Sequence, residues 1–301
     1  MKRVLTALVL IPLVLLAVFK APSWLFTLLV GAVALLALKE YLDLVEAYGV
    51  KPLRWLTYGY VAVAFVVSAS LSTSFFSDLG HVQPLAYLMG ALGALLLLWA
   101  FAFLIAAMGS DDLTKAFPSA AMSGLGLFYV GVPMLSAAVL QRNSWFELIF
   151  TFFAVWAGDT VAMYTGKAIG KHKMSPRISP NKTWEGAIGS VIGSVVACWI
   201  LTHFAASIDT LLHGRAVFGD GPNSETPVYV KFVLSGTKLI LTAILLNVAA
   251  QLGDLVESLI KRGANVKDSG TMLPGHGGIL DRIDALLFAT PVALVLFEFV
   301  R

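Results

Sequence analysis

Acidic and basic residues gather near the carboxyl end of a chain that is otherwise strongly apolar. They lie in SLIKRGANVKDSGTMLPGHGGILDRID, residues 258–284, and on the apolar helix predicted to precede it. Polar residues on that helix recur at helical spacing and therefore share one face: Gln251, Asp254, Ser258 and Lys261. If the helix crosses a membrane, an ionised Asp254 costs at least about 2.5–3.5 kcal/mol unless water, a cation or a partner meets it.

The segment LPGHGGILDRID adds a glycine turn and two more carboxylates. Gly277 and Gly278 allow backbone N–H groups to point at one anion, and Asp281 and Asp284 begin the next predicted helix. Each acid alone is also explained by the preference of helix N-termini for negative charge. Together with nearby basic residues, Asp254 and Asp281 suit Mg²⁺, which takes one or two protein carboxylates and completes its shell with water and phosphate oxygens. These residues together suit a divalent cation that holds a polyphosphate, with the basic side chains neutralising the phosphate charge.

A second cluster covers residues 157–186, AGDTVAMYTGKAIGKHKMSPRISPNKTWEG. Asp159 is an acid inside an apolar run, which favours a functional role. Thr183 and Glu185 are also explained as the N-cap and the first-turn acid of the next helix. The segment between Asp159 and Thr183 is basic, and its charges are also explained by contact with lipid headgroups. Its basic residues are Lys167, Lys171, Lys173, Arg177 and Lys182. Walker, G-x-S-x-G, H-E-x-x-H and C-x-x-C motifs do not occur, so phosphate handling would depend on these loops and carboxylates.

The elements that position these residues are membrane helices. The chain has 301 residues, of which 58% are hydrophobic and 13% charged, and its mean hydropathy of +0.84 lies outside the soluble range. We predict an all-α, polytopic integral membrane protein of about nine transmembrane helices. The spans are 3–19, 23–39, 55–74, 84–108, 118–140, 145–168, 184–206, 230–256 and 280–300. Residues 1–140 form the N-terminal helices, and 141–301 form a catalytic region with cytoplasmic loops 169–183 and 258–279.

Lysine and arginine residues fix the predicted orientation. With the N-terminus in the cytoplasm, fifteen of the 21 basic residues fall on the cytoplasmic side and six on the other. The opening MKRVLTALVLIPLVLLAVFK resembles a signal peptide, but no convincing cleavage site follows, so it is interpreted as a retained span. The single cysteine, Cys198, lies in an apolar run and offers neither a disulfide nor a thiolate site.

Residues 258–284 resemble the signature of the phosphatidate cytidylyltransferases, or CDP-diacylglycerol synthases. Ser-x-x-Lys-Arg, Lys-Asp, Pro-x-His-Gly-Gly and Asp-Arg-x-Asp follow one another here. SPNKTWEG and the run GD...Y.GK..GK are similar to two further family segments, so the resemblance covers roughly the C-terminal half. Asn181 departs from the lysine expected before Lys182, which puts a role for that position in doubt.

The resemblance implies that the protein transfers a cytidylyl group from CTP to phosphatidic acid, with Mg²⁺ and release of pyrophosphate. Asp254 and Asp281 would be the metal ligands, with Asp284 and Asp159 behind them, and a second cation stays open. Further catalytic candidates are Lys261, Arg262, Lys267, Asp268, His276 and Arg282. His276 would bond a phosphate or brace the turn, and Ser258 would touch metal or nucleotide. Substrate-binding candidates are Ser258, Gly277, Gly278, Lys182, Thr183, Glu185 and Lys167.

The expected partners are CTP, phosphatidic acid and the bilayer, without nucleic acid, and a homodimer stays open. The expected location is the inner (cytoplasmic) membrane, with the site on the cytoplasmic side. One alternative is a prenyl-phosphate sugar-phosphate transferase, suggested by DDLTK at residues 111–115, where the acids also suit a helix cap. Another is a cation-coupled transporter using Asp159 and Asp254, which predicts polar residues continuing toward the outer side.

Overall fold

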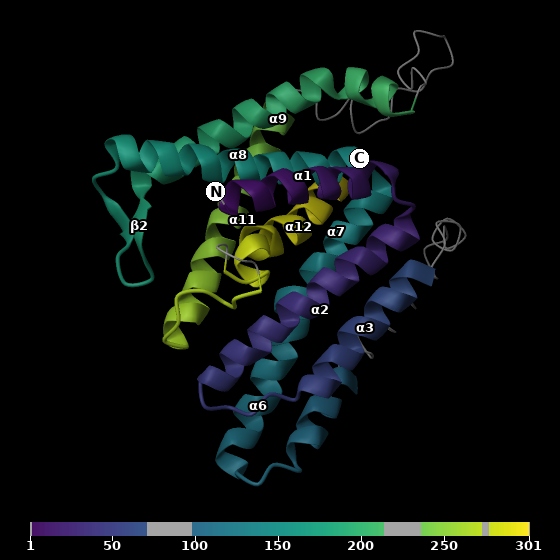
Figure 1. Cartoon of the computed structure of the whole chain (residues 1–301), viewed down its shortest axis with the longest axis vertical. Helices are drawn as coiled ribbons and strands as arrows, with labels where there is room; N and C mark the ends of the chain where they lie inside the picture. The colour runs from purple at the N-terminus through teal and green to yellow at the C-terminus, as the bar shows by residue number, and fades with distance from the viewer. Residues whose placement is uncertain (1, 71–97, 214–235, 273–276, 301) are drawn as a thin grey trace.

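The protein is an assembly of long helices with one small hairpin (Figure 1). The computed structural model describes residues 2–70, 98–213, 236–272 and 277–300. The helices of the first half are α1 (Lys2–Lys20), α2 (Ser23–Ala47), α3 (Arg54–Ser70), a helical segment Leu98–Ala107, α6 (Leu113–Gly126), the π turn η1 (Leu127–Gly131) and α7 (Val132–Asn143). The second half contains α8 (Trp145–Ile169), β1 (Lys173–Ser175), β2 (Ser179–Thr183), α9 (Trp184–His213), α11 (Gly236–Gly263) and α12 (Leu280–Val300).

Five helical stretches of the described chain are long and apolar enough to cross a membrane. They are Ser23–Ala47, Leu113–Asn143, Trp145–Ile169, Trp184–Leu211 and Gly236–Gly263. These helices make the chain a multi-pass membrane protein, as predicted. Most of the predicted span 84–108 lies outside the described residues.

The two predicted cytoplasmic loops differ from expectation in the structure. Helix α11 continues to Gly263, as the shared helical face of Ser258 and Lys261 predicts, so the first residues of the predicted segment 258–279 are helical. Residues 169–183 contain an antiparallel hairpin in which β1 pairs with β2, Lys173 lying opposite Thr183. The hairpin projects beyond the helices that it joins, α8 and α9 (Figure 1). The helical membrane part therefore carries one short β element at its edge.

Close packing of α8 on α9 depends on two small residues of α9, Gly189 and Gly193, which lie four residues apart. A Cβ atom at Gly193 would lie 2.6 Å from Val161 Cγ2, and one at Gly189 would lie 2.5 Å from Thr165 Oγ1. Both distances are shorter than a van der Waals contact, so the two backbones can approach only because these positions lack side chains.

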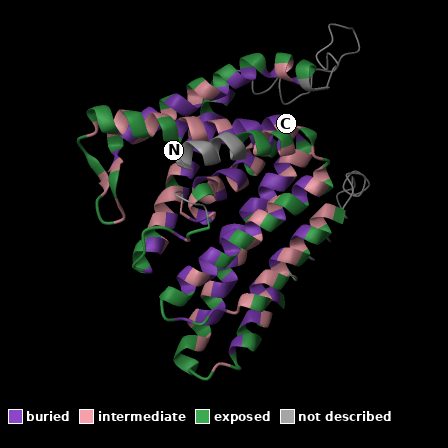
Figure 2. Ribbon diagram, in the orientation of Figure 1, coloured by how far each residue is buried: buried purple, intermediate pink, exposed green. Residues whose placement is uncertain are grey.

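Helix α12 lies between the two main clusters of buried side chains. Phe297 packs in a cluster with Phe146 and Phe150 of α8, and Leu280 packs in another with Leu38 of α2. Buried residues concentrate where these helices meet, whereas α9 presents many exposed residues (Figure 2). The first turn of α12 is thereby fixed against α2.

The helix of residues 113–143 is continuous but widens in its middle. Its α6 and α7 parts are joined by the π turn Leu127–Gly131, which the sequence did not predict. π turns are rare and occur often at functional sites. This turn contributes the buried residues Tyr129 and Val130.

The packing of α8 on α9 can be tested by adding bulk. We expect Gly193→Leu to lower the free energy of unfolding by about 1–3 kcal/mol, because overpacking displaces Val161. Thermal unfolding in detergent measures the change. Ile192→Leu places the same side chain one residue earlier, where Ile192 is exposed, and should leave the melting temperature near that of the unsubstituted protein. Equal melting temperatures for the two variants would contradict this packing.

Candidate active site

Lys261 lies between two acids at the carboxyl end of α11. Its Nζ is 2.5 Å from Asp281 Oδ1 and forms a second ion pair with Glu257 Oε2. The exposed fractions of these side chains are 11% for Lys261, 5% for Asp281 and 0% for Glu257. Glu257 was missed in the sequence, although an acid four residues before a lysine on one helix is a recognisable pair. One buried ammonium group therefore serves two buried carboxylates.

Asp281 also organises the loop between α11 and α12. Its Oδ2 accepts hydrogen bonds from Ser269 N at 2.9 Å, Ser269 Oγ at 3.0 Å and Gly278 N at 2.8 Å. Gly277, with φ of 81°, makes the turn that brings Gly278 there. The glycine turn thus points an N–H group at an anion, as predicted, but this anion is the carboxylate of Asp281.

Glu40 of α2 caps the start of α12. It accepts hydrogen bonds from Ile279 N at 3.0 Å and Leu280 N at 2.9 Å, and only 3% of the residue is exposed. Ser269 Oγ lies 2.9 Å from Glu40 Oε2 and 3.0 Å from Asp281 Oδ2, so the two carboxylates share its single hydroxyl proton. A Cβ atom at Gly278 would collide with Glu40 Oε2. This residue was also missed, because the predicted second span ended at residue 39. The sequence feature that could have indicated Glu40 is the adjacent pair Lys39 and Glu40 inside an otherwise apolar helix.

The β hairpin is tied to α11 by two contacts. Lys182 Nζ lies 2.7 Å from Asp254 Oδ2, and both side chains are partly buried. Arg262 Nε donates a hydrogen bond of 3.3 Å to the carbonyl oxygen of Ile178. The segment containing Lys182 therefore borders the site from a second side.

Three aspartates from three helices share one electrostatic environment. Asp159 of α8 interacts with Asp254 of α11, and Asp284 of α12 interacts with both. Lys182 acts on Asp159, and Lys261 acts on Asp284. With Glu257 and Asp281, five acidic side chains and these two lysines gather in this part of the described chain.

A buried polar ladder continues from Asp254 into the apolar part of α11. Gln251 Nε2 donates to Asn247 Oδ1 at 2.6 Å, and Asn247 Nδ2 donates to Ser190 Oγ at 2.9 Å and Ser194 Oγ at 2.7 Å. Ser258 Oγ lies 3.4 Å from Asp254 Oδ1, at the long limit of a hydrogen bond. The predicted polar stripe of α11 is confirmed. Toward the amino end of α11 it continues to Asn247, whose hydrogen bonds to Ser190 and Ser194 connect α11 with α9.

Thr183 and Glu185 have structural partners that match their alternative interpretation. Thr183 Oγ1 accepts a hydrogen bond of 3.1 Å from Gly186 N, so it caps the start of α9. Glu185 accepts a hydrogen bond of 3.2 Å from His172 N and lies 2.6 Å from His172 Nδ1. These contacts close the hairpin on the helix.

Most of the remaining predicted residues are exposed. Arg262 also donates a hydrogen bond of 3.1 Å to the carbonyl oxygen of Val266. His276 lies outside the described residues. Exposed positions, open to a ligand that approaches from water, are occupied by Lys167, Arg262, Lys267, Asp268 and Arg282.

The donor set fits Mg²⁺ by its chemistry. In the described part of the chain, no three acidic, histidine or cysteine side chains form a ready-made metal site. Mg²⁺ does not need one, because it binds one or two carboxylates and keeps water or phosphate oxygens. Asp254 can supply such a ligand. Asp281 can do so only if its carboxylate binds the ion while it keeps its contacts with Lys261 and with the N–H groups of Ser269 and Gly278.

The two alternative sites have ordinary structural explanations. Asp112 accepts hydrogen bonds from Thr114 N and Thr114 Oγ1 at 3.0 and 2.6 Å, so it caps α6. These bonds hold the pKa of Asp112 below its ordinary value. Toward the other end of α8, the acid Glu147 is buried, but the buried rings of Phe150 and Phe152 separate it from Asp159 along the helix. The buried polar contacts that continue from Asp254 lie instead on α11 and α9, through Gln251, Asn247, Ser190 and Ser194.

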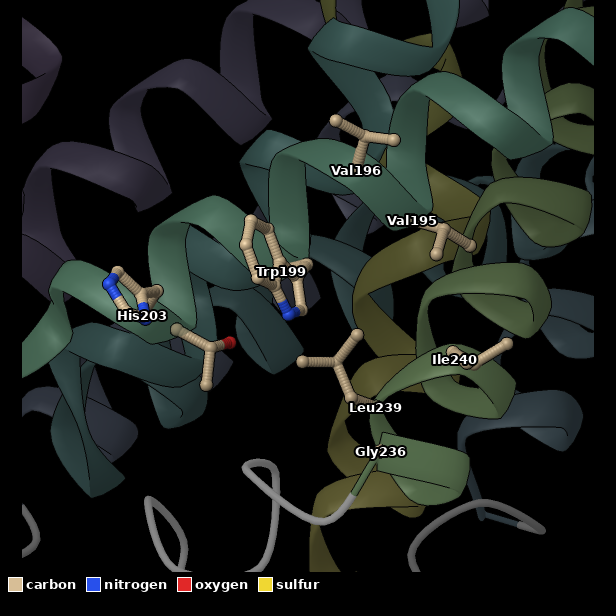
Figure 3. A pocket seen from close by; sticks show the side chains of 8 residues that line it. Val195, Val196, Trp199, His203, Gly236, Leu239 and Ile240 are labelled. Carbon is tan, nitrogen blue, oxygen red and sulfur yellow. The ribbon is translucent and has the colours of Figure 1, made fainter.

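A groove of about 340 Å³ lies between α9 and α11, away from the carboxylates (Figure 3). Its lining is mostly apolar and includes Val195, Trp199 and Leu239, with His203 stacked against Trp199. These residues lie toward the carboxyl half of α9 and the amino half of α11, whereas Lys182 and Asp254 lie toward the opposite ends. The groove has no acidic lining residue and does not suit a metal-bound nucleotide.

Comparisons with known proteins cover the whole chain. A model of the cytidylyltransferase family matches residues 1–300. The phosphatidate cytidylyltransferase of Haemophilus influenzae is 31% identical over 309 aligned positions, which cover 99% of each chain. The protein of the same name from Staphylococcus haemolyticus is 37% identical over 60% of each chain, and that from Brucella abortus is 36% identical over 54% of this chain and 52% of its own. The chain therefore belongs to the cytidylyltransferase family.

Proposed function

We propose that this protein is a CTP-dependent phosphatidate cytidylyltransferase. A phosphate oxygen of phosphatidic acid attacks the α-phosphorus of CTP, a new P–O bond forms, and the bond to the β-phosphate breaks. The products are CDP-diacylglycerol and pyrophosphate. The proposal is supported by the end-to-end match to the relative of that name from Haemophilus influenzae.

One structural observation carries the proposal. A lysine of the hairpin and aspartates of three helices lie close together: Lys182, Asp159, Asp254 and Asp284. Lys182 is positioned to neutralise charge on a polyphosphate that reaches Asp254. In-line transfer between two bound phosphates needs mainly positioning and charge stabilisation, without a covalent enzyme intermediate. The arrangement supplies both.

We propose that Asp254 and Asp281 hold Mg²⁺, with Asp159 and Asp284 completing the acidic environment. When bound, the ion supplies Lewis-acid stabilisation of phosphate oxygens. In this proposal Lys261 orients Asp281 and neutralises the negative charges of Asp281 and Glu257. Ser269 and Gly278 keep the same carboxylate in register.

We also propose the topology that the basic residues favour. The protein would span the inner membrane about nine times, with its N-terminus and the carboxylate site on the cytoplasmic side, where CTP is available. The excess of lysine and arginine on the loops of that side supports this orientation.

The reaction is tested by following pyrophosphate release from CTP and phosphatidic acid in mixed micelles with Mg²⁺. Turnover is expected for the unsubstituted protein, and Asp254→Asn should lower kcat at least about 100-fold, because even outer-shell changes at metal sites cost 10- to 100-fold. Asp281→Asn should raise the Mg²⁺ concentration needed for half-maximal rate. Absence of turnover in the folded unsubstituted protein would refute the proposed activity, and an unchanged Mg²⁺ dependence for Asp281→Asn would refute its role as a ligand.

The role of Lys182 is tested against another lysine of the same hairpin. Lys182→Met should lower kcat/KM by roughly 10- to 100-fold, since a hydrogen bond to a charged group contributes about 1.5–3 kcal/mol. Lys173→Met removes an exposed lysine from β1 and should change kcat/KM little. Steady-state kinetics with CTP varied measure both variants. Equal kinetics would show that the ion pair of Lys182 with Asp254 has no part in turnover.

The orientation is tested with single cysteines. In a Cys198→Ala background, Lys267→Cys and Lys20→Cys each place a thiol at an exposed position, on the cytoplasmic and outer sides respectively under the proposed topology. A membrane-impermeant thiol reagent applied to intact cells, or to spheroplasts where an outer membrane is present, should label Lys20→Cys. It should label Lys267→Cys only after lysis. The reverse pattern would invert the topology.

A further inference from the structure

Tyr129 places a polar group among the apolar helices on the inner side of the acidic site. It lies in the π turn between α6 and α7, and 8% of the residue is exposed. Within the described chain, its buried hydroxyl has no hydrogen-bond partner. Buried polar groups are nearly always paired with protein, water or ligand, so such a hydroxyl requires an explanation.

The environment of Tyr129 points toward the proposed active site. It packs in the cluster of buried side chains that contains Val256 of α11 and Ile283 of α12, which flank Glu257 and Asp284 in the sequence. Glu257 Oε1 is likewise buried without a hydrogen-bond partner among the described residues. Tyr41 lies beside Tyr129 but, unlike Tyr129, has a paired hydroxyl: it donates a hydrogen bond of 2.8 Å to the carbonyl oxygen of Met122. The two rings pack with centroids 5.5 Å apart.

The π turn explains how Tyr129 reaches this place. The widened turn shifts the direction of the side chains that follow it on the helix. Gly126 lets the turn approach α2, since a Cβ atom there would lie 3.0 Å from Leu38 Cδ1 and 3.0 Å from Tyr41 Cε1. The ring of Tyr129 is thus held by packing, which leaves its hydroxyl available as a neutral, oriented donor.

We infer that the Tyr129 hydroxyl donates a hydrogen bond to a phosphate oxygen of bound substrate. The inference rests on the proposed function and adds a substrate-contacting residue to it. A phosphate brought to the acidic site by a cation presents oxygens that need donors, and a phenol offers one without adding charge. Lys182 approaches from the exposed hairpin, whereas Tyr129 lies in the middle of a buried membrane helix. That position favours the lipid phosphate over the phosphates of CTP.

The matched experiment compares Tyr129→Phe with Tyr41→Phe. Tyr129→Phe should lower kcat/KM for phosphatidic acid by roughly 10- to 100-fold, as expected for loss of a hydrogen bond to a charged group. Its melting temperature without substrate should stay near that of the unsubstituted protein, because no partner within the described protein is lost. Tyr41→Phe should lower the melting temperature and leave KM for both substrates unchanged.

Separate titrations of the two substrates identify the phosphate. A rise in KM confined to phosphatidic acid assigns the contact to the lipid, and a rise confined to CTP assigns it to the nucleotide. Unchanged kinetics for Tyr129→Phe, while the unsubstituted protein turns over, would overturn the inference and leave the proposed function intact. A fall in melting temperature as large as that of Tyr41→Phe, with activity lost in proportion, would assign Tyr129 a structural role and overturn it as well.

Discussion

The rest of the site depends on how the buried ammonium group of Lys261 is balanced. A charge removed from water is tolerated only when opposite charges and hydrogen bonds replace its hydration, and loss of one partner from a buried pair costs about 3–5 kcal/mol. Here the partners come from two elements, Glu257 from the same helix and Asp281 from α12. The need to pair this charge fixes the end of α11 against the start of α12. It also determines where the loop between them can run.

That loop is positioned through a shared set of acceptors rather than by its own helix or strand. Asp281 and Glu40 together accept hydrogen bonds from Ser269, Gly278, Ile279 and Leu280. Every one of these donors would be costly to bury unpaired. Ser269 and residues 278–280 are thus held by the acids of α2 and α12, while the side chains of Lys267 and Asp268 are exposed. Held backbone beside exposed charged side chains suits a site that binds a charged ligand from a rigid scaffold.

The sequence was sufficient to predict a multi-pass helical membrane protein, the polar stripe of α11 and the family. Hydropathy and helical periodicity are local properties, and Gln251 with Asp254 repeats at an offset that any helix preserves. It was insufficient for Glu40 and Tyr129, because their roles arise from contacts more than a hundred residues away along the chain, or from a π turn with no known local signal. The same limit applies to Asp281. Its place in the motif was evident, but its bond with Lys261 follows only from the packing of α12.

The N-terminal helices therefore belong to the site as much as the signature does. A division at residue 140 separates the half that carries the quoted motifs from the half that contains Glu40 and Tyr129, and the family match extends over both halves, residues 1–300. Apolar helices can vary in sequence while keeping their packing, so few positions in them attract notice. The positions that matter are those where a polar group is buried, because its desolvation must be repaid by a specific partner. In this half, the burial of polar groups is consequently a better guide to function than motif similarity.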